Sequence, residues 1–101
     1  MSPPRRLYLG VVSVTLRLGQ VYSLKDKRMV LRSMKDLVRG HFDVSCSEID
    51  GMDERERAVI VFAGLATSRP RAEELGSKVV EYVERRFGDY DLFFATDVVE
   101  L

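Results

Sequence analysis

The chain has 101 residues, of which 46% are hydrophobic, and its formal net charge is zero. This length and hydrophobic fraction are enough for one packed core, so we predict a single domain over residues 1–101. No apolar run approaches the roughly 18–20 residues that span a bilayer, and the lone Cys46 excludes an intrachain disulfide. We therefore expect a cytoplasmic protein that makes no membrane contact.

The charges are distributed unevenly along the chain. Residues 1–42 contain nine Lys/Arg and two Asp/Glu, whereas residues 43–101 contain seven and fourteen, so the two parts carry +7 and −7. The zero net charge therefore conceals a basic first part.

The first regular element follows a polar start, residues 1–6, that we expect to be frayed. Residues 7–18 are rich in β-branched and aromatic types and predict a long strand. Its even-numbered positions are apolar throughout, whereas the odd-numbered positions turn polar from Ser13 onwards. One face of this strand should pack on helices.

A helix is predicted over residues 23–40. Ser23 and Asp26 have the spacing of a capping box, and Gly40 is a typical helix stop. Six apolar positions of this helix share one arc and predict its buried face. They are Leu24, Val30, Leu31, Met34, Leu37 and Val38.

The rest of the chain predicts two strands, a second helix and a final strand. Residues 43–49 form a strand whose alternation slips between Cys46 and Ile49, which indicates a bulge. A polar hairpin loop over residues 50–56 leads to an interior strand over residues 57–67, apolar on both faces. Ser68 and Pro70 begin a helix that ends at Gly88, and residues 90–99 form the last strand.

The order β-α-β-β-α-β predicts an α+β, ferredoxin-like fold. Right-handed crossovers give a four-stranded antiparallel sheet with both helices on one face and the first and third strands in the centre. The opposite face would carry Leu7, Leu9 and Val11, more apolar surface than a solvated sheet face normally shows. Such a face is more often covered by a second subunit, and an irregular tail segment is the alternative.

The first helix also carries a basic stripe. Lys25, Arg28, Arg32, Lys35 and Arg39 follow one another at intervals of three and four residues and should align on the solvent side. Cations in the first turn oppose the helix dipole, so the stripe is either a functional anion site or an ordinary solvated face.

Lys27 is the one lysine or arginine of this helix that does not lie on the stripe, because it projects toward the apolar arc. Its stem should lie along the core edge and its ammonium should emerge beside the free amides at the helix start, where an anion could bind.

Other residues give weaker signals. His41 has no catalytic partner placed by any motif, and the aromatic side chains lack the basic-aromatic strand pattern of RNA-recognition modules. The chain contains no Asn, which excludes an acylphosphatase of this topology. An acidic cluster near the end of the second strand lacks the ligand spacing of a calcium loop, so we expect no metal site. It comprises Glu48, Asp50, Asp53, Glu54 and Glu56. No motif indicates a cofactor or an enzymatic activity, and we expect neither.

The run Ser23-Leu24-Lys25-Asp26-Lys27-Arg28 and the basic helix that follows resemble the YlxP-like family of small bacterial proteins. Asp43-Val44-Ser45, Glu48 and Arg57-Ala58-Val59 extend the resemblance over nearly the whole chain. It implies a ferredoxin-like fold, a cytoplasmic location and no established activity. Genes of the family tend to lie beside those for translation initiation and a ribosome-binding factor, which implies a link to ribosomes. Two departures are Asp43, where we expect Asn, and a hairpin loop without bulky residues.

Two functional hypotheses follow. The first is an RNA-binding, ribosome-associated protein whose basic helix lies along the phosphates of ribosomal RNA. The second is a homodimeric interaction protein that uses its open sheet face, with a small-ligand regulatory domain as a more distant variant.

Overall fold

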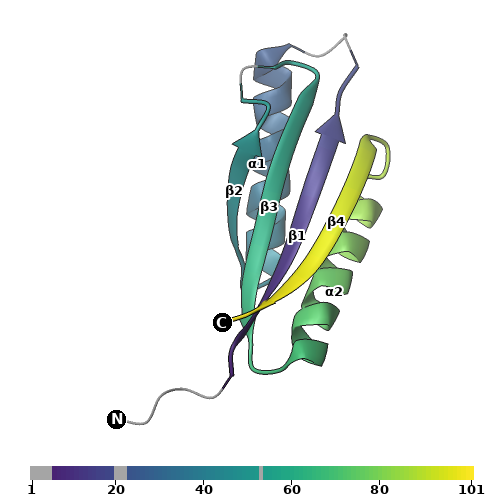
Figure 1. The fold of residues 1–101 in the computed structure, drawn as a ribbon. Coiled ribbons are helices and arrows are strands. Elements are labelled where there is room, and N and C mark those ends of the chain that lie inside the picture. Colours follow the sequence, from purple (N-terminus) through teal and green to yellow (C-terminus); the bar gives the residue numbers. More distant parts are fainter. Residues whose placement is uncertain (1–5, 20–22, 53) are drawn as a thin grey trace.

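The computed structural model describes residues 6–19, 23–52 and 54–101. The predicted frayed start lies outside these residues except for Arg6. The elements follow the predicted order (Figure 1) and are β1 (Tyr8–Arg17), α1 (Leu24–His41), β2 (Ser45–Asp50), β3 (Arg57–Ala66), α2 (Arg69–Phe87) and β4 (Asp91–Glu100).

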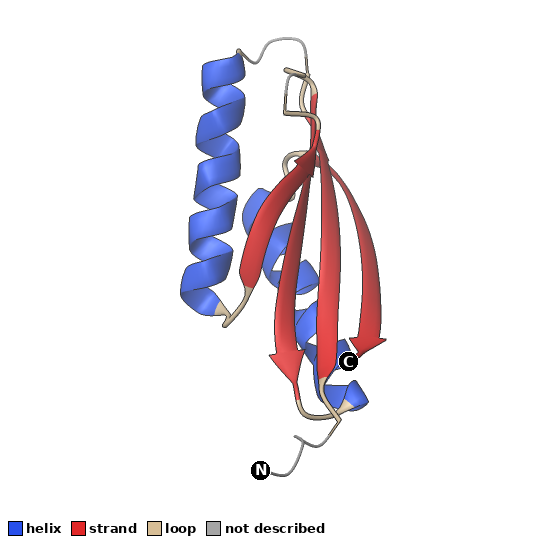
Figure 2. Cartoon of the chain, turned by 60° about the vertical axis from the view of Figure 1, so that its left-hand side comes forward, coloured by secondary structure: helices blue, strands red, loops and turns tan. Residues whose placement is uncertain are grey.

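The four strands form one antiparallel sheet in the order β2-β3-β1-β4. Both helices lie on the same side of this sheet, and the other side is open (Figure 2). The ferredoxin-like arrangement with β1 and β3 in the centre is therefore confirmed. The β2–β3 register shifts between Glu48 and Asp50, which confirms an irregularity near the predicted place.

The core lies between the sheet and the helices. The even-numbered side chains of β1, including Val12, Val14 and Leu16, are buried there as predicted. From α1, Leu31, Met34 and Val38 reach this core, and α2 contributes its predicted apolar side. Leu24 is a correction, because it begins α1 and its side chain is 39% exposed. The predicted stop of α1 is also one residue short, since the helix continues through His41.

The two helices approach the sheet differently. A Cβ atom added at Gly10 would lie 2.7 Å from the carbonyl oxygen of Ala72, so the first turn of α2 lies directly against β1. The α1 helix contacts α2 and β2 instead, and its longer buried side chains fill the space to the sheet. In the described part of the chain, no helix is long and apolar enough to cross a membrane.

Candidate nucleic-acid interface

The start of α1 is fixed by the predicted capping box. The Asp26 amide donates to Ser23 Oγ and the Ser23 amide donates to Asp26 Oδ2, both at 3.1 Å. The hydrogen bond from the Ser23 amide, followed by that from the Ser23 side chain, lowers the pKa of the Asp26 carboxyl. This pairing places one negative charge in the first turn, where the helix dipole favours it.

Four members of the basic stripe line one shallow depression between α1 and β2, which we call the basic groove. Arg28, Arg32, Lys35 and Arg39 supply the cations. Leu31, Asp36 and Glu48 complete the lining, so four cations and two carboxylates give a local charge of +2. Lys25 is exposed and lies outside this groove.

Within residues 6–19, 23–52 and 54–101, most cations of the stripe have no carboxylate partner. Arg39 forms an ion pair with Asp36 at 2.9 Å. Among the described residues, no carboxylate lies within ion-pairing distance of Arg28, Arg32 or Lys35.

The second helix provides a contrast within the same molecule. On α2, Lys78 pairs with Glu74 at 2.8 Å and Arg85 pairs with Glu81 at 3.4 Å. The hydrogen bond from Lys78 also lowers the pKa of Glu74. Two cations of α2 thus pair with carboxylates of the same helix, whereas three of the four cations in the basic groove remain available to an external anion.

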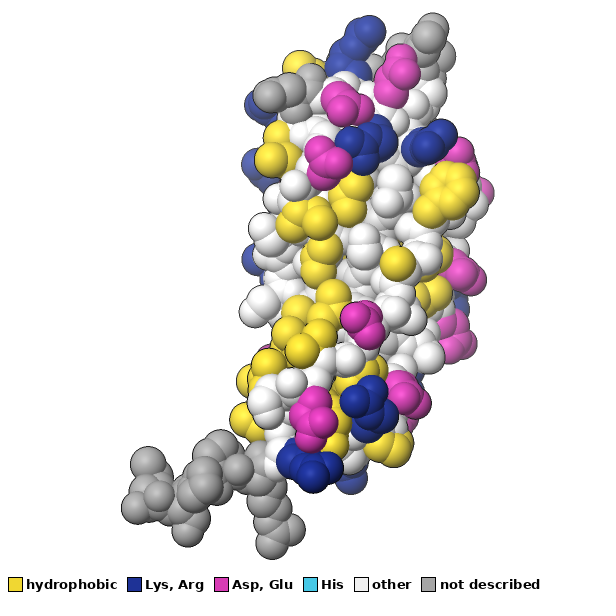
Figure 3. All heavy atoms as spheres, viewed as in Figure 1, with side chains coloured by type: hydrophobic (Ala, Val, Ile, Leu, Met, Phe, Trp, Pro, Cys, Tyr) yellow, Lys and Arg dark blue, Asp and Glu magenta, His cyan; other side chains and the backbone are white. Residues whose placement is uncertain are grey.

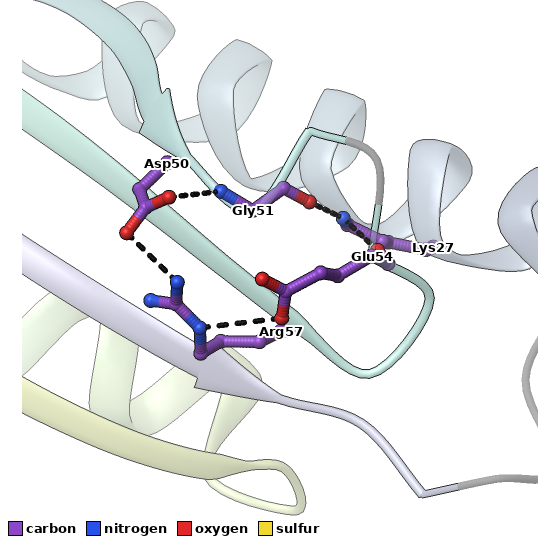
Figure 4. Close-up of polar contacts among 5 residues, drawn as sticks. All are labelled: Lys27, Asp50, Gly51, Glu54 and Arg57. Carbon is purple, nitrogen blue, oxygen red and sulfur yellow. Dashed lines mark hydrogen bonds and ion pairs between the residues drawn. The ribbon is translucent and has the colours of Figure 1, made fainter.

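Lys27 does not belong to this site. Its side chain is 1% exposed, and its ammonium donates to the carbonyl oxygens of Gly51 and Glu54 in the β2–β3 loop (Figure 4). The prediction that this ammonium lies beside the free amides of the first turn of α1 is therefore wrong. The physical reason is that the loop brings two backbone acceptors to the buried end of the side chain, which satisfies a charge that burial would otherwise disfavour.

The loop that receives Lys27 is held on its other side by Arg57. The guanidinium contacts Asp50 at 2.8 Å and Glu54 at 3.4 Å. The hydrogen bond from Arg57 lowers the pKa of Asp50, and the hydrogen bond to Asp50 raises the pKa of Arg57. Gly51 has a φ angle of +81°, which a side chain would strain. Sequence analysis missed the contact between Lys27 and this loop. The position of Lys27 on the apolar arc of α1 was the feature that could have indicated a buried ammonium.

The remaining candidates take structural positions. The His41 ring is exposed at the end of α1 and stacks on Tyr82 with ring centroids 4.5 Å apart. Within the described residues, no three carboxylate, His or Cys side chains gather as a metal site would require. Asp53, a member of the acidic cluster, lies outside those residues.

The fold and the groove define a small ferredoxin-like α+β domain with an exposed cationic surface along its first helix. The chain belongs to the DUF503 family, described as a protein family of unknown function, whose model matches residues 9–94. It is 34% identical over 62 residues to the uncharacterized protein YlxP of Bacillus subtilis (strain 168), a match that covers 61% of this chain and 67% of that protein.

One solved structure shares the fold at low sequence identity, and a second gives a lower score. A putative PII-like signaling protein from Thermus thermophilus superposes with a TM-score of 0.52 at 16% identity, covering 97% of this chain and 92% of the other. The de novo designed protein Foldit4 gives a TM-score of 0.49 at 16% identity, with coverages of 88% and 96%. At such identities the likeness concerns the fold alone.

Proposed function

We propose that this protein is a non-enzymatic binding protein whose basic groove contacts the phosphate backbone of RNA. The observation that supports this proposal is the set of unpaired cations Arg28, Arg32 and Lys35 in one depression. A phosphate backbone presents negative charges at regular intervals, and an elongated row of cations matches that pattern better than it matches a single small anion.

The groove gives the binding a definite character. Its cations stand on an exposed helix face, so they contact phosphates without reading bases, and binding is largely independent of sequence. Each contact releases condensed counterions, which makes the affinity fall as salt rises. Lys25 lies on the same helix outside the groove and extends the cationic surface toward the helix start.

Ribosomal RNA is the ligand to test first, because the family resemblance implies a link to ribosomes. The test compares the wild type with a variant in which Arg28, Arg32 and Lys35 are replaced by Gln. Binding to single-stranded ribosomal RNA fragments is measured over a range of salt. The slope of log affinity against log salt should fall by about 0.7 for each phosphate that is no longer neutralised, or about 2 for the triple variant.

The matched control is the α2 variant with Arg71, Lys78 and Arg85 replaced by Gln, which removes the same charge from the other helix. It should keep the wild-type slope and most of the affinity. Absence of wild-type binding near physiological salt would refute the proposal. An equal loss in both triple variants would also refute it, because the effect would then be one of net charge and not of the groove.

A further inference from the structure

The sheet face opposite the helices carries exposed apolar side chains. Leu65 is 66% exposed, Phe93 54% and Val99 42%. Figure 3, drawn from the open side of the sheet, shows hydrophobic side chains that follow one another along the length of this face. Water contacts this surface in the isolated subunit, so covering it would be favourable.

The strand register orders this face into cross-strand rows of three residues. Leu65, Leu9 and Val99 form an apolar row near one end. Val59, Thr15 and Phe93 form a second row nearer the other end. Beyond the second row, Arg57, Arg17 and Asp91 form a charged row.

We propose that a second copy of this chain covers the open sheet face in a two-fold symmetric dimer whose axis runs parallel to β1 and directly over it. This inference is independent of RNA binding, because the face lies on the side of the sheet opposite α1. Two-fold symmetry is the usual way in which one surface patch pairs with itself.

The direction of the axis follows from the rows. An axis parallel to β1 places each row over the same row of the partner, with the order of strands reversed. Leu65 of one subunit then meets Val99 of the other, and Val59 meets Phe93. In the charged row, Arg57 of one subunit lies across from Asp91 of the other, so opposite charges face each other. An in-plane axis perpendicular to β1 would instead place Leu65, Leu9 and Val99 against the charged row, which would bury charge against apolar surface.

Arg17 fits the parallel arrangement as well. Although it lies on the strand nearest the axis, its guanidinium lies over the ring of Phe93, 5.4 Å from the ring centroid. The side chain therefore leans toward β4 and away from its symmetry mate. Asp97 shares a row with Ala63 and Val11, so in this arrangement it lies across from Ala63 of the other subunit, and its carboxylate accepts a hydrogen bond from the Val98 amide.

The area is sufficient for a specific dimer. The three ten-residue strands that meet across this axis, β3, β1 and β4, give a face of roughly 500 Å² at standard strand spacings. Two such faces bury about 1,000 Å² in total, which is the size of the smallest specific interfaces.

The first experiment is sedimentation of the wild type over a range of concentrations, alongside Leu65→Glu and Phe93→Glu. The wild type should be a dimer, and each variant should raise the dimer dissociation constant at least tenfold. Both side chains are exposed, so the variants should keep the wild-type circular dichroism. Met29→Glu is the matched control, because Met29 is 63% exposed but lies on α1; it should remain dimeric.

A monomeric wild type at high concentration, a higher oligomer, or dimerisation that survives both face variants would refute the proposal. The axis is tested separately with Leu9→Cys in a Cys46→Ser background and a short thiol-to-thiol cross-linker. With the axis parallel to β1, Leu9 faces its own symmetry mate and cross-linking should give a covalent dimer. A sedimenting dimer that fails to cross-link would overturn the parallel orientation.

Discussion

The ammonium of Lys27, in the first turn of α1, donates a hydrogen bond to the carbonyl oxygen of Gly51, a separation of 24 residues. A second bond reaches the Glu54 carbonyl, and among the described residues no carboxylate pairs with this buried cation. Two backbone acceptors therefore take the place that an anion would occupy in an ion pair. The helix start and the β2–β3 loop consequently depend on each other.

Replacing Lys27 with Met should lower the free energy of unfolding by about 1–3 kcal/mol, because the two carbonyl oxygens lose a buried donor while the apolar stem is retained. Urea unfolding measures the change. Lys25→Met is the control: Lys25 is exposed, so its replacement should change stability by less than about 0.5 kcal/mol. Equal midpoints for the two variants would show that the Lys27 bonds contribute nothing.

Two glycines should respond oppositely to alanine. Gly51→Ala should destabilise the protein by more than about 1 kcal/mol, because a Cβ atom there would lie 2.5 Å from the Arg57 carbonyl oxygen at a positive φ. Gly40→Ala meets nothing within 4 Å inside α1 and should stabilise by about 0.5–1 kcal/mol. Thermal unfolding of the pair tests both expectations, and shifts of the same sign would contradict them.

Leu31→Ala tests the buried face of α1. Leu31 is 3% exposed, so removing its side chain should cost about 2–5 kcal/mol through reduced burial and the cavity left behind. Met29→Ala, on the exposed side of the same helix, serves as the control and should change stability only slightly. A loss below about 0.5 kcal/mol for Leu31→Ala would be inconsistent with the described packing.

Acid should weaken the contact between Asp50 and Arg57. Because the folded state lowers the pKa of Asp50 below its ordinary value of 3.8, this contact stabilises the protein above that value, and the stabilisation disappears as the pH falls through the folded pKa. Asp50→Asn should therefore be less stable than the wild type at about pH 6, with the difference shrinking toward about pH 2. Melting temperatures across this range provide the measurement, and a difference independent of pH would refute the assignment. Asp26 and Glu74 are present in both proteins, so the comparison isolates Asp50.

The elements of the fold were predictable because their signals are local. Ser23 and Asp26 mark the start of α1, and Gly88 marks the end of α2 through residue types that act within one turn. The alternation of residues 8–18 likewise identified the buried side of β1. Leu24 was placed wrongly because a helical wheel ignores where the sheet ends, and the first turn of α1 leaves this side chain partly exposed.

The site was predictable only in part. Spacing along α1 identified the cations that line the basic groove, since helical geometry fixes which side chains align. The groove's other wall includes Glu48 from β2, and tertiary packing alone brings it there. The position of Lys27 was unpredictable for the same reason, because its acceptors are backbone atoms of a distant loop. Every residue has a backbone carbonyl, so residue types do not indicate which carbonyl accepts a hydrogen bond.

The central position of β1 bears on how the chain folds. This strand is synthesised before its neighbour β4, and Tyr8 lies opposite Glu100. Among the strands that the structure describes, β2 and β3 are the one pair of neighbours that also follow each other in the sequence. Distant contacts of this kind slow folding. Until β4 has been synthesised and has paired with β1, one edge of β1 stays unpaired. A nascent chain in that state is vulnerable to pairing with a neighbouring molecule.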